Sequence, residues 1–277
     1  MSVASTSKVH SMSTDLLPDI RPFEPRDVQI IDKNDRTLLV FSTIYFNQGD
    51  GPLELVAGQD PSGAVPTEDI ERDVLQNIYQ QGGGVREEAV GSFVWHREHL
   101  HYHFTDFVDF RLEPTLETYT EYGISAEDIS AEEKATFCVR DVSRVYADTQ
   151  NTPDDAVYRI CNEVKQGVSV GWGDTYFFDY PDQDIDVTGL PAGVYRLVFE
   201  ANPRKRFYES NYENNISWAL IDMDSEARTV EVLELYPIDS PEVEHVYPQQ
   251  DFEKGSSDID YTNQFVPAKE HRNAQYQ

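Results

Sequence analysis

The segment WHREHLHYHFTDFVDFRL, residues 95–112, alternates polar and apolar side chains over most of its length. Because successive side chains of a strand point to opposite faces of a sheet, this period of two predicts extended structure. His99, His101 and His103 then share one face, and the apolar and aromatic residues between them share the other. The segment therefore predicts a half-buried strand that carries a row of imidazoles.

Short runs rich in β-branched and aromatic residues predict further strands on both sides of this segment. Glycines 82–84 are typical of a hairpin turn; a phosphate-binding loop is the alternative, but no Gly-Lys-Ser/Thr and no predicted helix follow them. One short helix is predicted over Ser125–Glu133, with Ser125 as its cap. The predicted strands are 28–32, 36–46, 74–79, 85–93, 135–142, 184–187, 194–201, 216–222 and 229–235.

These elements predict a mainly β fold: a single antiparallel, sandwich-like domain with long loops and few short helices. The polar residues 1–14 are interpreted as an N-terminal tail, and residues 15–236 as the domain. The Pro-containing polar residues 237–277 are interpreted as a C-terminal tail.

The charge is strongly negative, with 22 Lys and Arg against 51 Asp and Glu and a net charge of −29. Such a surface repels phosphate backbones, which argues against nucleic-acid binding, and it attracts amines and metal ions. The alternative is a solvated acidic surface of the halophilic type, which only keeps the protein soluble. No apolar run reaches membrane-spanning length, and the first residues lack the apolar core of a signal peptide. A cytoplasmic chain and a secreted chain without its signal both remain open.

The histidine row is a candidate metal site. On one strand His99, His101 and His103 lie roughly 6.6 Å apart from i to i+2, close enough for long imidazole side chains to converge on one ion. Neutral imidazole suits both copper and zinc, and three histidines with an open position also suit a hydrolytic zinc site. The alternative is a surface stripe of separate histidines.

Several segments, taken in order, resemble the catalytic domain of the lysyl oxidase family over about Leu16 to Asp222. The Trp95-His96 pair followed by His-x-His-x-His resembles the copper motif of that family. Matches in the correct order are more specific than any single motif. The other matching segments are KATFC at 134–138, QGVSVGWGDTY at 166–176, DVTGLPAGVY at 186–195 and ESNYENN at 209–215.

The resemblance implies copper at the three histidines and a lysine tyrosylquinone cofactor made from Lys134 and Tyr176. Without it, Lys134 is an ordinary surface lysine and Tyr176 a core tyrosine. The implied reaction oxidises primary amines, either small alkyl amines or the lysine ε-amine of peptides, to aldehydes. It consumes O2 and releases ammonia and hydrogen peroxide. Asp174 is the first candidate for the base that removes the α-proton, unless it is a turn carboxylate, and His96 is the second, unless it orients a copper ligand.

The resemblance also implies a calcium site and a disulfide. Cys138 and Cys161 align with family cysteines that pair, which favours an oxidising, secreted setting; two free thiols are the alternative. Oxygen ligands suit calcium, while asparagine-rich turn chemistry is the alternative. The implied calcium ligands are Asp19, the Ile20 carbonyl, Glu209, Asn211, Asn214 and Asn215; the family usually has Asp where this chain has Asn211.

Two departures from the family pattern concern a cysteine and the candidate base. Trp172 stands where the animal proteins have a cysteine, and Phe110 replaces a family histidine that could have been the base. The expected function is a copper amine oxidase of the protein-lysine 6-oxidase type. The alternatives are a catalytically inactive metal-binding or calcium-stabilised β module, and a zinc-dependent hydrolase.

Overall fold

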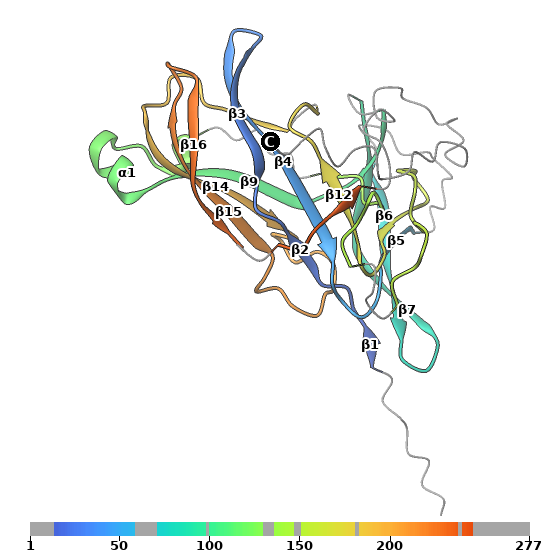
Figure 1. The fold of residues 1–277 in the computed structure, drawn as a ribbon. Helices are drawn as coiled ribbons and strands as arrows, with labels where there is room; N and C mark the ends of the chain where they lie inside the picture. The colour runs from blue at the N-terminus through green and yellow to red at the C-terminus, as the bar shows by residue number, and fades with distance from the viewer. Residues whose placement is uncertain are drawn as a thin grey trace, which may run out of the picture.

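The computed structural model describes residues 14–58, 71–97, 100–129, 136–146, 151–180, 183–237 and 240–245. These residues form three antiparallel sheets, and the long strand β4 lies between the other two sheets in Figure 1. The predicted mainly β, antiparallel fold class is confirmed. No helix in the described ranges is long and apolar enough to cross a membrane.

The first sheet carries the histidines and has the order β11-β5-β6-β7-β8, with β1 paired to β6. Glycines 82–84 all adopt positive φ in the turn between β6 and β7, which only glycine tolerates easily, so the predicted hairpin is confirmed. The strands of this sheet are β1 Asp15–Leu16, β5 Leu53–Ala57, β6 Arg72–Gln80, β7 Val85–His96, β8 His101–Phe104 and β11 Lys165–Val168.

The second sheet has the order β13-β4-β12-β10-β17, and β2 and β3 also pair with β4. Every residue of β4 from Thr37 to Asn47 is buried, because sheet partners and core cover both of its faces. The strands are β2 Ile20–Pro22, β3 Arg26–Lys33, β4 Arg36–Asn47, β10 Ser143–Arg144, β12 Trp172–Tyr176, β13 Asp184–Asp186 and β17 Glu244–His245.

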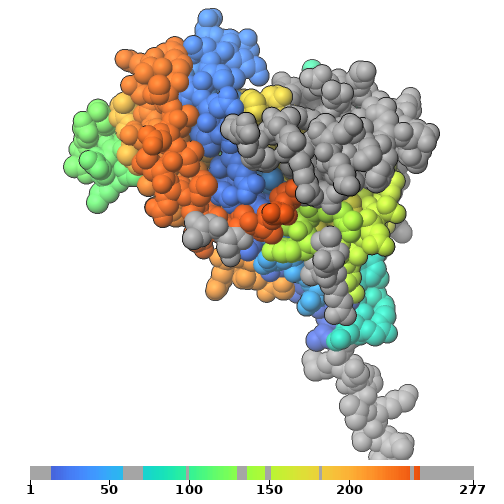
Figure 2. Space-filling model, in the orientation of Figure 1, coloured from blue at the N-terminus to red at the C-terminus, as the bar shows by residue number. Residues whose placement is uncertain are grey.

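The third sheet, β16-β15-β14-β9, closes the opposite side of the core. In Figure 2 the orange β16 lies beside the blue β3 on the surface, and Arg228 next to β16 bonds the Asp32 carboxylate of β3. The strands are β9 Val108–Pro114, β14 Gly193–Ala201, β15 Ile216–Asp224 and β16 Thr229–Tyr236.

One hydrophobic cluster fills the space between the three sheets. It includes Phe41 of β4, Phe104 of β8 and Phe199 of β14, all with 0% exposed surface. Burying a phenylalanine side chain is worth about 1.5–3 kcal/mol, so these rings hold the sheets together. Phe137, also fully buried, brings the segment 136–142 against the same cluster.

Some predicted boundaries are wrong. Residues 95–112 do not form one strand: β7 ends at His96, β8 begins at His101 and β9 begins at Val108. The chain turns between them, and Leu100 and Asp106 adopt positive φ. Alternation of side chains continues through such turns, so the pattern did not reveal them.

Two further predictions need correction. The described residues of the expected strand 135–142 are not a strand; Phe137 makes an isolated bridge to Phe104. Ser125 caps only the short 3-10 helix η1, Ala126–Asp128, and residues 130–133 of the expected helix lie outside the described residues. The helix α1, Leu116–Tyr122, was not predicted, although Thr115 caps its start and Gly123 its end.

Candidate functional site

The histidine site is built on the hairpin of β7 and β8. His96 pairs with His101 across the hairpin, and His103 pairs with Val94. The Nε2 atoms of His101 and His103 lie 2.9 Å apart, and the ring of His96 stacks on that of His103 with centroids 4.6 Å apart. Three imidazoles therefore gather at one end of the sheet.

The spacing of the two Nε2 atoms fits a shared metal ion. Two nitrogens about 2.0 Å from one ion and at right angles around it stand roughly 2.8 Å apart. His101 and His103 share β8 and its face, as the alternation predicted. The described strand β8 starts at His101 and carries two of the three histidines expected on one strand. His99 lies outside the described residues.

A hydroxyl behind His103 sets the orientation of its ring. Its Nδ1 lies 3.1 Å from Thr136 Oγ1, and His103 is fully buried. When Nδ1 carries the proton and donates it to this hydroxyl, Nε2 keeps its lone pair for a metal. Thr136 was not singled out in the sequence, since a threonine beside a lysine carries no signal of its own.

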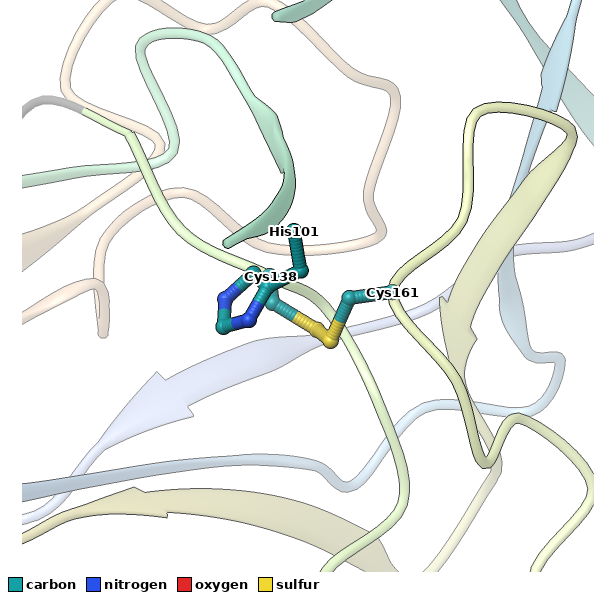
Figure 3. Close-up of side chains that lie close together, drawn as sticks. All are labelled: His101, Cys138 and Cys161. Atoms are coloured by element: carbon teal, nitrogen blue, oxygen red, sulfur yellow. A yellow bond between two sulfur atoms is a disulfide. The ribbon is translucent and has the colours of Figure 1, made fainter. Parts of the chain in front are cut away.

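The disulfide of Cys138 and Cys161 is formed, which confirms the pairing. Figure 3 shows it beside the His101 ring, and one ring nitrogen and the two sulfurs lie within 4.8 Å of one another. Because the sulfurs are bonded to each other, they are not thiolate ligands. The Cys161 carbonyl accepts a hydrogen bond from the backbone N–H of Tyr102, 3.1 Å away, so the bridge is tied to the histidine strand.

Tyr176 lies buried at the end of β12. Its hydroxyl donates to the Cys138 carbonyl at 3.2 Å and accepts from the Cys138 N–H at 3.1 Å. Its ring packs on Phe137 with centroids 4.0 Å apart. Burial raises the pKa of Tyr176 well above its usual range, so the phenol holds its proton at neutral pH.

Asp174, two residues earlier on β12, is fully buried. One carboxylate oxygen accepts from the Thr175 N–H at 2.8 Å, and the other is buried on the side of the facing Tyr45, whose hydroxyl lowers the pKa of the carboxyl. Burial raises the pKa of Asp174 to about 7, and the positive charge of Arg140 opposes that rise. A carboxyl group that titrates near neutrality suits a general base, which is the role expected of Asp174.

Three consecutive residues join the histidines to the tyrosine. Thr136 contacts His103, Phe137 exchanges two backbone hydrogen bonds with Phe104 of β8, and Cys138 holds the Tyr176 hydroxyl. The histidine strand and the tyrosine are thus fixed to one short segment. Lys134 precedes this segment and lies outside the described residues.

Tyr45 was missed by the sequence reasoning. It lies on β4 directly opposite Asp174 in the ladder, and its hydroxyl donates to the Cys138 carbonyl at 3.1 Å. An aromatic residue inside an apolar strand usually belongs to the core, and Tyr45 does pack there against Phe107. Only the fold brings it to the site.

The expected calcium ligands also converge in part. Asn214 donates to the Asp19 carboxylate at 3.0 Å, and Asn215 donates to Glu209 at 2.7 Å. The side-chain oxygens of Asn214 and Asn215 are buried without a hydrogen-bond partner. Buried oxygens of this kind, next to two carboxylates, fit a hard cation.

The other two expected ligands, Asn211 and Ile20, make hydrogen bonds of a different kind. The Asn211 side-chain oxygen accepts from the Glu213 N–H at 2.9 Å within its own turn. The Ile20 N–H donates to Glu209 at 3.0 Å, which places Ile20 beside the cluster. Burial raises the pKa of Glu209 to about 7.

The fold and the site define a mainly antiparallel β protein in which a histidine hairpin, a disulfide and a buried tyrosine meet. The chain belongs to the lysyl oxidase family, whose sequence model, described as lysyl oxidase, matches residues 85–232. The family resemblance of the sequence is thereby confirmed.

Curated relatives match a shorter stretch. The chain is 32% identical to lysyl oxidase homolog 2 of Gallus gallus over 128 residues, which is 45% of this chain and 14% of that protein. It is 31% identical to lysyl oxidase homolog 4 of Homo sapiens over 130 residues, 45% of this chain and 15% of that protein. The match therefore spans about one seventh of the length of these relatives.

Proposed function

We propose that this chain is a copper-dependent amine oxidase. It converts a primary amine, O2 and water to an aldehyde, ammonia and hydrogen peroxide. The observation that carries the proposal is the pair of Nε2 atoms of His101 and His103, 2.9 Å apart, joined through residues 136–138 to the buried Tyr176. Membership of the lysyl oxidase family supports the same class of reaction.

Copper would be held by His99, His101 and His103, with Thr136 orienting His103 from behind. When bound, copper supplies the redox chemistry that imidazole and phenol groups lack. His96, stacked on His103, limits the directions in which that ring can turn. The family, rather than the geometry, favours copper over zinc at this site.

The organic cofactor would be lysine tyrosylquinone, formed from Lys134 and Tyr176. Its formation creates a bond between the Lys134 nitrogen and the Tyr176 ring, adds one oxygen atom to the ring and removes four hydrogen atoms overall. Two molecules of O2 are consumed: one gives one atom to the ring and the other atom to water, and the second is reduced to hydrogen peroxide. When present, the quinone supplies the carbonyl that a substrate amine attacks.

Asp174 would act as the base in amine oxidation. Its carboxyl group titrates near neutral pH because it is buried, so it can take a proton from carbon and release it again. It projects from the same face of β12 as Tyr176, since the two residues are two positions apart on one strand.

The remaining assignments are proposals of the same kind. Residues 15–236 would form the catalytic domain, with Glu244–His245 of the polar segment 237–277 pairing on β10. Substrates would be lysyl side chains of peptides or small primary amines, attracted by the net charge of −29. Calcium would bind between Asp19 and Glu209 as a structural ion, and the disulfide favours a secreted protein.

A peroxide-release assay over a panel of alkyl amines and lysyl peptides tests the proposal. We expect release from the copper-loaded wild type, and none from Lys134→Ala or from His103→Ala. Lys165→Ala is the matched control, because Lys165 is a lysine bound to Glu54 on a different strand of the protein. Peroxide release by Lys134→Ala at the wild-type rate would contradict the quinone mechanism.

A further inference from the structure

Two phenols share one backbone carbonyl in the core. The Cys138 carbonyl oxygen accepts from Tyr45 at 3.1 Å and from Tyr176 at 3.2 Å. Within the described ranges these phenols are its hydrogen-bond donors. Both tyrosines are 1% exposed, so water does not reach the carbonyl to replace either of them.

Charged and aromatic side chains from several elements pack around the two phenols. Asp174 of β12 stands directly across the ladder from Tyr45, and Arg140 contributes a positive charge from the segment 136–142. Tyr180, after β12, lies edge-on to the Tyr176 ring with centroids 6.0 Å apart. Asp141, which is also buried, adds a second carboxyl whose charge acts on Tyr45 and Asp174. The phenols thus share a buried space with two carboxyls and one guanidinium.

Conversion of Tyr176 to a quinone requires its phenol proton to leave. In this structure that proton is donated to the Cys138 carbonyl. A buried carbonyl left without any donor is costly, because burial has already removed its water. With Tyr45 in place, the carbonyl keeps a donor after the Tyr176 proton has gone, and the Cys138 N–H still donates to the remaining oxygen.

We propose that Tyr45 is a positioning residue for cofactor formation: its hydroxyl keeps a hydrogen bond to the Cys138 carbonyl, so that Tyr176 can lose its phenol proton. This inference rests on the proposed function, because it concerns the formation of the quinone from Tyr176. It assigns a role to a residue that neither binds the metal nor becomes part of the cofactor. Tyr45 would influence how fast the cofactor forms more than how fast the finished enzyme turns over.

The test follows quinone formation after copper is added in air, by visible absorbance and by the mass of the intact chain, over a range of pH. We expect Tyr45→Phe to form the cofactor about tenfold more slowly near neutral pH, since loss of the shared hydrogen bond disfavours proton loss from Tyr176. The pH profile of the rate should move upward by about one unit, and the two proteins should converge at high pH.

Tyr195→Phe is the matched control. Tyr195 is also fully buried, and its hydroxyl also donates to a carbonyl, that of Pro191 at 2.9 Å, but it lies on β14 away from Asp174. The Tyr195→Phe protein should lose about as much stability as Tyr45→Phe, and the pH profile of its quinone formation should match that of wild type. Site-specific 3-fluorotyrosine at position 45 keeps the hydroxyl and donates more strongly, so the profile should move the opposite way.

The outcomes distinguish a failure of the proposed function from a failure of the role of Tyr45. If wild type forms no quinone under any condition, the proposed function fails, and this inference fails with it. If wild type forms the quinone but Tyr45→Phe and the fluorinated protein keep the wild-type pH profile, only the role of Tyr45 is overturned. A shift of equal size in Tyr195→Phe would also overturn it, by assigning the effect to general destabilisation.

Discussion

Replacement of Asp174 by asparagine should make the protein more stable while it removes activity. The pKa of Asp174 rises from an unfolded value of 3.8 to about 7, because the folded protein buries the carboxyl group. The folded state therefore resists ionisation of a group that the unfolded chain ionises freely. An asparagine side chain at this position would have nearly the same shape and no charge at any pH.

The expected gain in unfolding free energy follows from the size of the pKa shift of Asp174. About three pKa units at 1.36 kcal/mol each correspond to about 4 kcal/mol, an upper figure that relaxation around the charge reduces. The sign is set by protonation: well below the unfolded pKa of 3.8 the carboxyl is neutral in both states and carries no penalty. The penalty grows between pH 4 and 7 and is fully present above pH 7.

Urea denaturation at pH 4 and at pH 8.5 measures the difference. Asp174→Asn should unfold with a free energy about 2–4 kcal/mol higher than wild type at pH 8.5, and within about 0.5 kcal/mol of wild type at pH 4. Its peroxide release should be lost at both pH values. An Asn variant that is no more stable at pH 8.5, or that gains equally at both pH values, would refute the argument from burial.

Three further predictions concern the metal sites and the disulfide. Thr136→Val should weaken copper binding about 10–100-fold in calorimetry, because His103 loses its orienting hydroxyl; unchanged affinity would remove Thr136 from the site. Calcium at about 100 times its dissociation constant should raise the unfolding free energy by about 2.7 kcal/mol, and Asn215→Ala should abolish that response; an equal response in both proteins would place the ion elsewhere. The bond between Cys138 and Cys161 closes a span of 23 residues, so the double Ser variant should lose about 3 kcal/mol in urea denaturation, and no loss would speak against a cross-linking role.

Part of this fold was predictable because some residues have strong conformational preferences of their own. The glycines at 82–84 carry their own conformational preference, so the hairpin of β6 and β7 followed from the sequence. Thr115 and Gly123 carry equally local signals as the caps of α1, but the helix between them has seven residues and no apolar period strong enough to reveal it.

Without the family resemblance, the site was predictable only where residues lie close together in the chain. His101 and His103 share a face because they are two residues apart on β8. His96 reaches His103 only because the chain reverses between β7 and β8, and the positive φ of Leu100 in that turn belongs to a residue type that gives no warning of it.

Tyr45 shows most clearly which site residues the sequence does not reveal. It lies 131 positions before Tyr176 in the printed sequence, and strand pairing between β4 and β12 brings it opposite Asp174. No local pattern distinguishes it from the buried aromatic residues around it. Register across a sheet is a property of the whole fold, so residues that act through it appear only in the structure.

Peptide mapping of the copper-loaded, air-exposed protein by mass spectrometry shows directly whether Lys134 and Tyr176 form the cofactor. We expect the peptides containing Lys134 and Tyr176 to be recovered as one cross-linked species, with one oxygen gained and four hydrogens lost. Recovery of both peptides separate and unmodified, from protein shown to contain copper, would contradict this expectation.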